Sequence, residues 1–417
     1  MKSLSTLSAT LIFLVPATTF ADDAYINGHW FDGSGFVERT VYVSDGLISF
    51  TRPEQIDNTH DLAGAFVVPP FGEAHNHDLT TDFEPQERIN EYLHDGVFYA
   101  KMQSAFSKGF DKLAPHFNNP ESMDVKFAFA PITGPGGHPI RIRELFFARG
   151  YYEGIFDSKD EIAGIGYTEV EDREELVRKW PNLIRQKPDF IKVMLSHSEE
   201  YDLRKDDQEY FGYKGIDPEL LPDLVELAHA EGLSLTAHID TAADFHYAVS
   251  AGIDEIAHLP GTDEREVIRS KDAFIAAEKD IAIITTISLT TKIKDDFPNY
   301  YEEIMKQHAS NLQRLKDAGV RILVGSDMPY RDTSVGEVFL LSELGVFTTE
   351  ETLEMWCKTT PRSIFPGRNI GRLDEGFEAS FLVLGGDPIE DFEHVRNILM
   401  RVKQGRPLAL ENLNQVD

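Results

Sequence analysis

The chain has little cysteine and few basic residues, and each shortage excludes a class of protein. One cysteine, Cys357, among 417 residues cannot form an internal disulfide or a cysteine-based metal cluster. Only 40 lysines and arginines oppose 71 aspartates and glutamates, a formal charge of −31. Nucleic acid and anionic membrane surfaces are therefore unfavourable partners. The sequence leaves the oligomeric state open between a monomer and a homo-oligomer.

Long apolar runs are also missing, and the one near the start is short. Residues 1–21 contain Lys2, an apolar run from Leu7 to Val15, and small residues at Thr19 and Ala21. This pattern is typical of a signal peptide that is cleaved after Ala21, and the run is too short to span a bilayer. We therefore expect a periplasmic or secreted protein without a membrane anchor. The alternative is a buried N-terminal helix.

Both ends of the mature chain are β-rich, and they flank a middle of different pattern. Residues 22–68 and 366–417 carry short alternating apolar runs, with hairpin signals at Asn27-Gly28 and Asp45-Gly46. Residues 69–365 alternate apolar strands with helices. This rhythm predicts the α/β class, a (β/α)₈ TIM-type barrel with a small composite β-sandwich domain built from both ends. A doubly wound sheet is the alternative, but its Gly-rich phosphate turn after an early strand is absent.

Metal-ligand residue types occur at the ends of five predicted strands. The eight predicted strands are Val67–His77, Val97–Met102, Val125–Thr133, Phe190–Leu195, Ser234–Ile239, Glu255–Leu259, Ala282–Ser288 and Arg321–Asp327. The polar residues at their ends are His75, His77, Lys192, His238, His258 and Asp327. A barrel places its active-site groups at the C-terminal ends of different strands. Five such ends are far less probable by chance than one HxH motif.

Side-chain parity predicts where these residues point. Lys192 shares a strand face with Phe190 and Met194, while the intervening residues are apolar and suit the helix-covered outer face. His238 lies between apolar Ala237 and Ile239, and Asp327 shares a strand face with Leu323 and Gly325, with Val324 on the opposite face. Each of them could separately be a satisfied core polar residue. That alternative does not explain why all of these side chains point into the barrel interior.

A lysine inside a barrel is costly as a bare ammonium, because desolvation disfavours the charged form. Deprotonation and reaction with CO₂ would give Lys192 a carbamate, an anionic oxygen ligand that can bridge two metals. The alternative is a lysine paired with a carboxylate such as Asp327.

These residues resemble the amidohydrolase superfamily of metal-dependent hydrolases over essentially the whole mature length. The phrases "EAHNHD", "AGIDEIAHLPG", "ILVGSD" and "IGRLDEGFEASFLVL" stand where that family places such phrases. Lys192 makes the chain similar to the binuclear, carbamylated-lysine dipeptidase and imidazolonepropionase-like branch. Mononuclear deaminases place a glutamate three residues after the histidine of the fifth strand, and here that position is Thr241.

The resemblance implies a ligand set and a mechanism. His75, His77 and Asp327 would hold one divalent ion, and His238 and His258 a second, with carbamylated Lys192 between them. Zinc is the default for imidazole-rich sites, although iron, manganese and cobalt also fit. A metal-bridged hydroxide would attack the scissile carbonyl, and Asp327 would carry the proton to the leaving amine.

A Gly-rich loop, residues 133–144, follows the third strand. His138 would contact the substrate carbonyl or the oxyanion, and Arg141 or Arg143 would bind a substrate carboxylate. Tyr330, just past Asp327, would read a substrate end. The alternative for the arginines is an ordinary surface loop.

The first hypothesis is a binuclear hydrolase that cleaves an amide bond in a small molecule, such as a dipeptide or an N-acyl amino acid. The second is hydrolysis of a cyclic amide or a lactone at the same site. A third, from another class, is a binding protein that has lost the chemistry. It would be expected to lose a ligand, and every ligand type is present.

Overall fold

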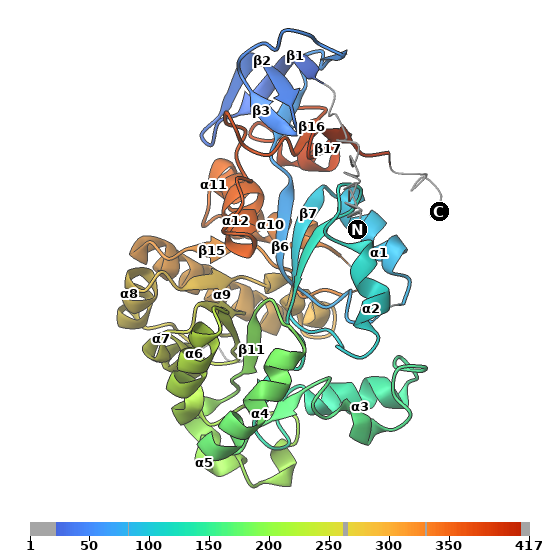
Figure 1. Cartoon of the computed structure of the whole chain (residues 1–417). Coiled ribbons are helices and arrows are strands. Elements are labelled where there is room, and N and C mark those ends of the chain that lie inside the picture. Colours follow the sequence, from blue (N-terminus) through green and yellow to red (C-terminus); the bar gives the residue numbers. More distant parts are fainter. Residues whose placement is uncertain (1–21, 82, 262–265, 330–331, 410–417) are drawn as a thin grey trace, which may run out of the picture.

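The computed structural model describes residues 22–81, 83–261, 266–329 and 332–409, and it has an α/β architecture. Figure 1 shows a sheet at one end of the molecule, where blue N-terminal strands and red C-terminal strands meet. The predicted signal peptide, residues 1–21, lies outside the described residues. Within the described ranges, no helix combines the length and the apolar character needed to cross a membrane.

The terminal sheet has eight strands and joins both ends of the sequence. Its order is β18-β17-β16-β5-β1-β2-β3, with β4 paired to β1. The strands are β1 Asp23–Phe31, β2 Phe36–Ser44, β3 Leu47–Ser49, β4 Asn58–Asp61, β5 Phe66–Val68, β16 Phe381–Leu384, β17 Ile398–Lys403 and β18 Arg406–Pro407. Tyr25, Trp30 and Phe381 belong to an apolar cluster of its own in this part of the chain.

One of the two predicted hairpins is confirmed, and the other prediction is wrong. Asp45 and Gly46 both have positive φ and form the turn between β2 and β3. Asn27 and Gly28 instead lie inside β1, where the pairing with β2 shifts register. Asn27 has a φ of 55°. A left-handed residue followed by glycine suits a bulge as well as a turn, and only the length of strand that continues beyond it distinguishes them.

Two prolines divide the first predicted strand between two sheets. β5 ends at Val68 in the terminal sheet, and β6 (Phe71–Asn76) begins a separate three-stranded sheet. Pro69 and Pro70 cannot donate a backbone hydrogen bond, so the ladder is interrupted there. The apolar character continues across the prolines, but the sheet does not.

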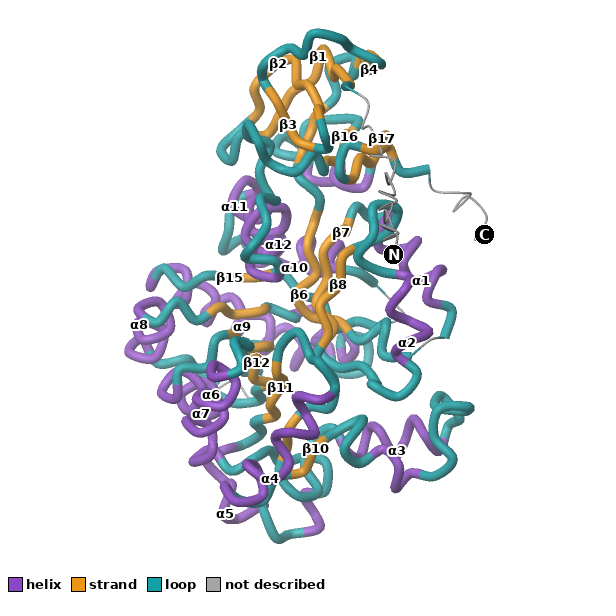
Figure 2. Tube along the Cα trace, in the orientation of Figure 1, coloured by secondary structure: helices purple, strands orange, loops and turns teal. Residues whose placement is uncertain are grey.

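The remaining strands form two parallel sheets (Figure 2). The three-stranded sheet, of order β6-β7-β8, adds β7 Val97–Met102 and β8 Asp124–Phe127. The other has the order β10-β9-β11-β12-β13-β14-β15, with β9 Ile132–Thr133, β10 Thr168–Glu169, β11 Ile191–Met194, β12 Leu235–His238, β13 Glu255–Ala257, β14 Ala282–Ile284 and β15 Ile322–Leu323. Each of the eight predicted strands contains part of these sheets. The third is split, because β8 and β9 lie in different sheets.

Backbone hydrogen bonds connect the two parallel sheets beyond the strands themselves. Ala74 N donates to Val324 O, and Asp327 N donates to His75 O, both at 2.8 Å. These bonds join β6 to the segment that follows β15, so the first and last of these strands lie side by side.

Helices alternate with the parallel strands, and some of them begin with a side-chain cap. They are α1 Pro85–His94, α2 Phe110–Leu113, α3 Ile140–Ala148, α4 Arg173–Arg185, α5 Tyr201–Arg204, α6 Leu221–Ala230, α7 Ala242–Ala251, α8 Ser270–Glu278, α9 Pro298–Ala318, α10 Ser334–Leu344, α11 Thr349–Glu354 and α12 Thr360–Ile364. α7 begins with a capping box between Thr241 and Asp244 and ends at Gly252. A capping box satisfies helix N–H groups that otherwise lack partners. Thr241 is thus a helix cap.

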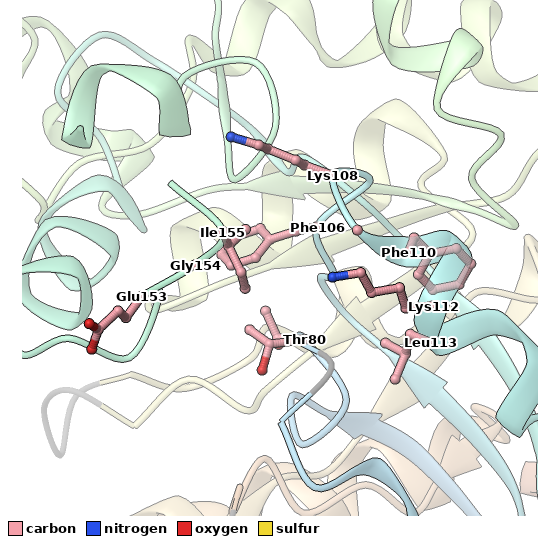
Figure 3. Close-up of a pocket in the computed structure, with 11 residues that line it drawn as sticks. Thr80, Phe106, Lys108, Phe110, Lys112, Leu113, Glu153, Gly154 and Ile155 are labelled. Carbon is pink, nitrogen blue, oxygen red and sulfur yellow. The ribbon is translucent and has the colours of Figure 1, made fainter. Parts of the chain in front are cut away.

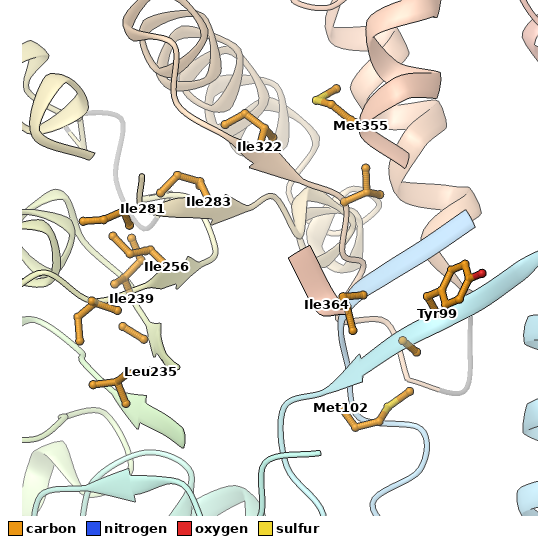
Figure 4. Close-up of a cluster of buried hydrophobic side chains, with 14 of the residues drawn as sticks. Tyr99, Met102, Leu235, Ile239, Ile256, Ile281, Ile283, Ile322, Met355 and Ile364 are labelled. Carbon is orange, nitrogen blue, oxygen red and sulfur yellow. The ribbon is translucent and has the colours of Figure 1, made fainter. Parts of the chain in front are cut away.

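The two faces of the parallel strands bury different side chains. Leu235, Ile256 and Ile322 belong to the large core cluster, part of which is drawn in Figure 4. Ala257 and Leu323 belong to a separate small cluster. This separation confirms the predicted alternation, since side chains on successive residues of a strand point to opposite faces.

Candidate metal centre

Six predicted ligands lie at the ends of five parallel strands. His75 is in β6 and His77 follows that strand, Lys192 is in β11, and His238 ends β12. The other two, His258 and Asp327, follow β13 and β15. Because the carboxyl ends of parallel strands meet at one edge of a sheet, the fold brings these side chains together.

Two histidines and one aspartate form a group of metal-ligand geometry. His75 Nε2 lies 3.6 Å from Asp327 Oδ2, and His77 Nε2 lies 3.5 Å from Asp327 Oδ1. One potential ligand atom from each residue lies within 4.8 Å of the other two. A carboxylate facing two imidazoles is a donor set that suits zinc and similar divalent ions.

Two further histidines lie against this group. The ring centroids of His238 and His258 are 4.4 Å apart, and those of His75 and His258 are 4.7 Å apart. His138 stacks on His238 at 4.8 Å with an interplanar angle of 22°. The predicted loop histidine therefore contacts the same cluster, through His238.

Three of the clustered imidazoles use one ring nitrogen for a protein partner. The pairs are His77 Nδ1 with Ser104 Oγ at 3.0 Å, His238 Nε2 with Asp240 Oδ1 at 3.2 Å, and His258 Nδ1 with Thr286 Oγ1 at 2.7 Å. Such a partner fixes the orientation of a ligating imidazole and leaves the other nitrogen to face the metal. Asp240, Ser104 and Thr286 were not identified from the sequence. The position of Asp240 two residues after His238 was the one available signal.

Lys192 is buried without compensation. Its side chain is among the largest fully buried ones, and Nζ makes no hydrogen bond within the described part of the chain. Burial lowers the pKa of Lys192 to about 7, although the Asp327 charge opposes this shift. The alternative of a hydrogen-bonded pair with Asp327 is therefore not present. A nearly neutral amine in a buried cluster is the form that reacts with CO₂.

Five other titratable groups of the cluster also have strongly shifted pKa values. Burial lowers the pKa values of His75, His77 and His258 well below the usual range, and that of His138 to about 3. Neutral imidazole is the form that binds a metal. Burial raises the pKa of Asp327 to about 6, against the nearby lysine charges. A carboxyl group whose pKa lies near neutral pH can both accept and return a proton.

Glu73 connects the first and last strands behind the cluster. Its buried carboxyl accepts bonds from His75 N at 3.0 Å, Ser326 N at 2.9 Å and Ser326 Oγ at 2.7 Å. Burial raises its pKa to about 8. Glu73 thus fixes the backbone at one ligand and at the residue before another. It lies inside the quoted motif, but its role depends on a contact 253 residues away.

The backbone also approaches closely at this seam. A Cβ atom on Gly325 would lie 2.6 Å from Ile284 Cγ2 and 2.8 Å from His75 N. His258 and Asp327 have positive φ values of 79° and 49°. Such strain in non-glycine residues persists only where surrounding structure enforces it, and it is common at functional sites. After Ala257, which faces inward, an extended His258 would face outward, so the turn redirects the ring.

The remaining predicted residues are less centrally placed. Arg143 is buried, and its guanidinium donates to Ser104 Oγ at 2.6 Å and Tyr152 Oη at 2.9 Å. It therefore supports the partner of His77. Arg141 is exposed, and its guanidinium stacks over Tyr213 at 4.7 Å from the ring centroid. Tyr330 lies outside the described residues.

The donor set fits a metal ion. His75, His77 and Asp327 present two imidazole nitrogens and a carboxylate oxygen to one space, and His238 and His258 lie against this group. The unpartnered Nζ of Lys192 is a buried polar atom that the described residues leave unsatisfied.

Comparisons with known proteins place the chain among hydrolases. The sequence profile of the amidohydrolase family matches residues 157–408. An ochratoxinase from Aspergillus niger is 26% identical over 244 residues, which are 58% of this chain and 50% of that protein. The chain thus spans about half the length of the curated relatives that it matches.

Solved structures share the fold over nearly the whole chain. The A. niger ochratoxinase structure has a TM-score of 0.72 at 20% identity and covers 93% of this chain and 96% of its own. A Xaa-Pro dipeptidase has a TM-score of 0.72 at 16% identity, with 93% and 99% coverage. Molinate hydrolase has a TM-score of 0.71 at 17% identity, with 96% and 97% coverage. At these identities the likeness shows the fold alone.

Proposed function

The chain belongs to the amidohydrolase family, and we propose that it is a metal-dependent hydrolase that cleaves a carbon–nitrogen amide bond with two divalent ions. The observation that carries this proposal is the convergence of four histidines, one aspartate and one unpartnered lysine at adjacent strand ends. The proposed substrates are dipeptides or N-acyl amino acids, in keeping with the amidohydrolase and dipeptidase names among similar structures. Cyclic amides and lactones are the second candidate class.

The proposed fold is a closed (β/α)₈ barrel with a β-sandwich domain from residues 22–68 and 366–417. The bonds Ala74 N to Val324 O and Asp327 N to His75 O support closure between the first and last strands. We also propose export to the periplasm or medium, which N-terminal sequencing of the mature protein would test. A start at Asp22 is the expected result.

In the proposed site, His75, His77 and Asp327 would hold one ion, and His238 and His258 the other. The Lys192 amine, as its carbamate, would join both. Zinc is the expected metal, and when bound the ions supply Lewis-acid polarisation of the carbonyl and an activated water. The chain's own groups do the positioning and the proton transfer.

Asp327 carries the proposed proton transfer. Its carboxylate, which faces His75 and His77, would accept a proton from the attacking water and return it to the leaving amine. The neutral His138 ring, stacked on His238, would donate a hydrogen bond to the substrate oxygen as charge develops on it. Arg143 holds Ser104 and, through it, the His77 ring.

The test combines metal counting with a substrate screen. Purified protein should contain about two ions per chain, measured by plasma mass spectrometry, and should release amine from some dipeptides or N-acyl amino acids. Asp327→Asn should abolish turnover more completely than it lowers metal content. His138→Ala should lower kcat/KM by 10²–10³-fold, as for loss of an oxyanion donor. Protein with full metal content that hydrolyses no amide, lactone or cyclic amide would refute the proposal.

A further inference from the structure

A cavity lies beside the candidate metal centre. It has a volume of about 360 Å³, within the range of small-molecule sites. Its lining is drawn in Figure 3 and comes from the segments around β6, α2 and residues 153–155. The lining residues are Thr80, Thr81, Phe106, Lys108, Gly109, Phe110, Lys112, Leu113, Glu153, Gly154 and Ile155.

The cavity and the metal centre share a wall. Thr80 Oγ1 donates to His77 O at 2.7 Å and to Ser104 O at 3.2 Å. Phe106 N donates to Thr80 O at 3.2 Å. Thr80 and Phe106 line the cavity, while His77 and Ser104 belong to the metal centre. The cavity therefore lies next to the segment that carries His77.

The walls of the cavity combine polar and apolar side chains, and two phenylalanines, Phe106 and Phe110, are among the apolar ones. The guanidinium of Arg143 covers Phe106 at 5.0 Å from the ring centroid, and Phe110 makes edge contacts with core phenylalanines at 4.9 Å. Both rings are thus held in place by their neighbours. Rigid aromatic walls favour a flat aromatic group, because stacked and edge contacts add to simple burial.

Charged side chains at the cavity add a preference for the charge of the bound group. Lys112 points toward the space between Thr80 and Phe106 in Figure 3, and Glu153 lies on the opposite side. Lys108 also lines the cavity and bonds Glu161 at 2.9 Å. That ion pair is exposed, so it is weak and its lysine can also serve a ligand.

We propose that this cavity is a specificity pocket that binds an aromatic group of the substrate, and that it favours a ring with an acidic substituent. The proposal rests on the proposed amide hydrolysis and adds the substrate class. It assigns Phe106 and Phe110 to contact with the ring and Lys112 to contact with the acidic substituent.

The test compares aromatic with aliphatic substrates in the metal-loaded enzyme. N-benzoyl-alanine and N-acetyl-phenylalanine carry the ring on opposite sides of the amide, and N-acetyl-alanine has none. At least one aromatic substrate should exceed the aliphatic one tenfold or more in kcat/KM. Ile155→Trp, which fills the cavity, and Phe110→Ala should each reduce that ratio at least fivefold. Phe274→Ala, an exposed phenylalanine of α8, should leave the ratio unchanged.

A charge reversal and a binding measurement complete the design. Lys112→Glu should reduce at least fivefold the preference for a para-carboxybenzoyl over a para-aminomethylbenzoyl substrate. Benzoate titrated into the metal-loaded protein, followed by NMR, should bind wild type at least fivefold more tightly than Ile155→Trp. Circular dichroism establishes that each variant is folded.

The outcomes separate the two proposals. If no substrate is cleaved but benzoate binding depends on Ile155, the pocket stands and the amide hydrolysis fails. If amides are cleaved with no aromatic preference, or with a preference that every folded pocket variant retains, the pocket is refuted. Equal benzoate affinity in wild type and Ile155→Trp refutes it as well.

Discussion

Replacing Lys192 with methionine should stabilise the metal-free protein while it abolishes activity. Methionine keeps the buried linear stem of the side chain and removes an amine that has no hydrogen-bond partner among the described residues. An unpartnered buried polar group costs about 1–3 kcal/mol in protein mutational data. The free energy of unfolding of the metal-free variant should therefore rise by about that amount.

The expected change is measurable as a shift in melting temperature. Unfolding entropy of about 2.1 cal/mol/K per residue gives about 0.9 kcal/mol/K for a chain of 417 residues. The gain then corresponds to a rise of about 1–3 °C in Tm for chelated protein, followed by circular dichroism. In the metal-loaded state the order should reverse, because wild type gains ligand binding energy that the variant has lost.

Lys101→Met provides a matched control. Lys101 is equally buried and lies in the neighbouring sheet, but its ammonium is ion-paired with Glu255 and also donates to Thr236 at 3.3 Å. Removing one member of a buried pair costs about 3–5 kcal/mol, so Tm should fall by about 3–6 °C. The two substitutions should change Tm in opposite directions, because Lys101 is paired with Glu255 and Lys192 has no hydrogen-bond partner among the described residues. If Lys192→Met destabilises the chelated protein as Lys101→Met does, or retains two bound ions, the assignment of Lys192 is wrong.

Three more substitutions test separate parts of the structure. Asp240→Asn should reduce metal affinity or activity about 10–100-fold, because it weakens the hydrogen bond that orients His238. A metal titration together with steady-state kinetics measures the effect, and wild-type values for both would contradict it. Gly325→Ala should lower the unfolding free energy by about 1–3 kcal/mol, because the new methyl group would press on the backbone of His75, and chelated protein that melts at the wild-type temperature would refute the close approach. Burial lowers the pKa of His308 to about 4 in the folded protein. As the pH falls, the unfolded chain is therefore protonated at this histidine before the folded protein is. The free energy of unfolding should fall by about 3 kcal/mol between about pH 6.5 and pH 4. His308→Leu should flatten that part of a urea-unfolding profile between pH 7.5 and 4.5, and an unchanged slope would exclude the histidine as its source.

The positions of the eight predicted strands were accessible from the sequence because parallel buried strands are apolar and lie between helices with clear stops, whereas the short strand β10 was missed. Gly252 and Gly319 end α7 and α9, as glycine after a helical pattern predicts. The hairpin at Asn27 was predicted incorrectly, because the same dipeptide serves a bulge. The break at Pro69 was also missed, since the apolar pattern that continues across it does not reveal a change of sheet.

The ligand residue types at the strand ends could be predicted from the sequence, since residue spacing and strand parity are local properties. The residues that hold these ligands in place could not. Glu73, Ser104 and Asp240 act through atoms that meet only in the folded chain, and the first of them binds a residue 253 positions away. The same is true of the cavity near His77, whose lining residues come from separate segments.

The sequence by itself determined which side chains can bind metal and which strand faces they occupy, because alternation and helix capping depend on neighbours along the chain. Only the tertiary structure decided that Lys192 has no partner, that His258 turns inward through a strained backbone, and that Arg143 holds Ser104. These features depend on contacts between distant strands, and no local pattern encodes them.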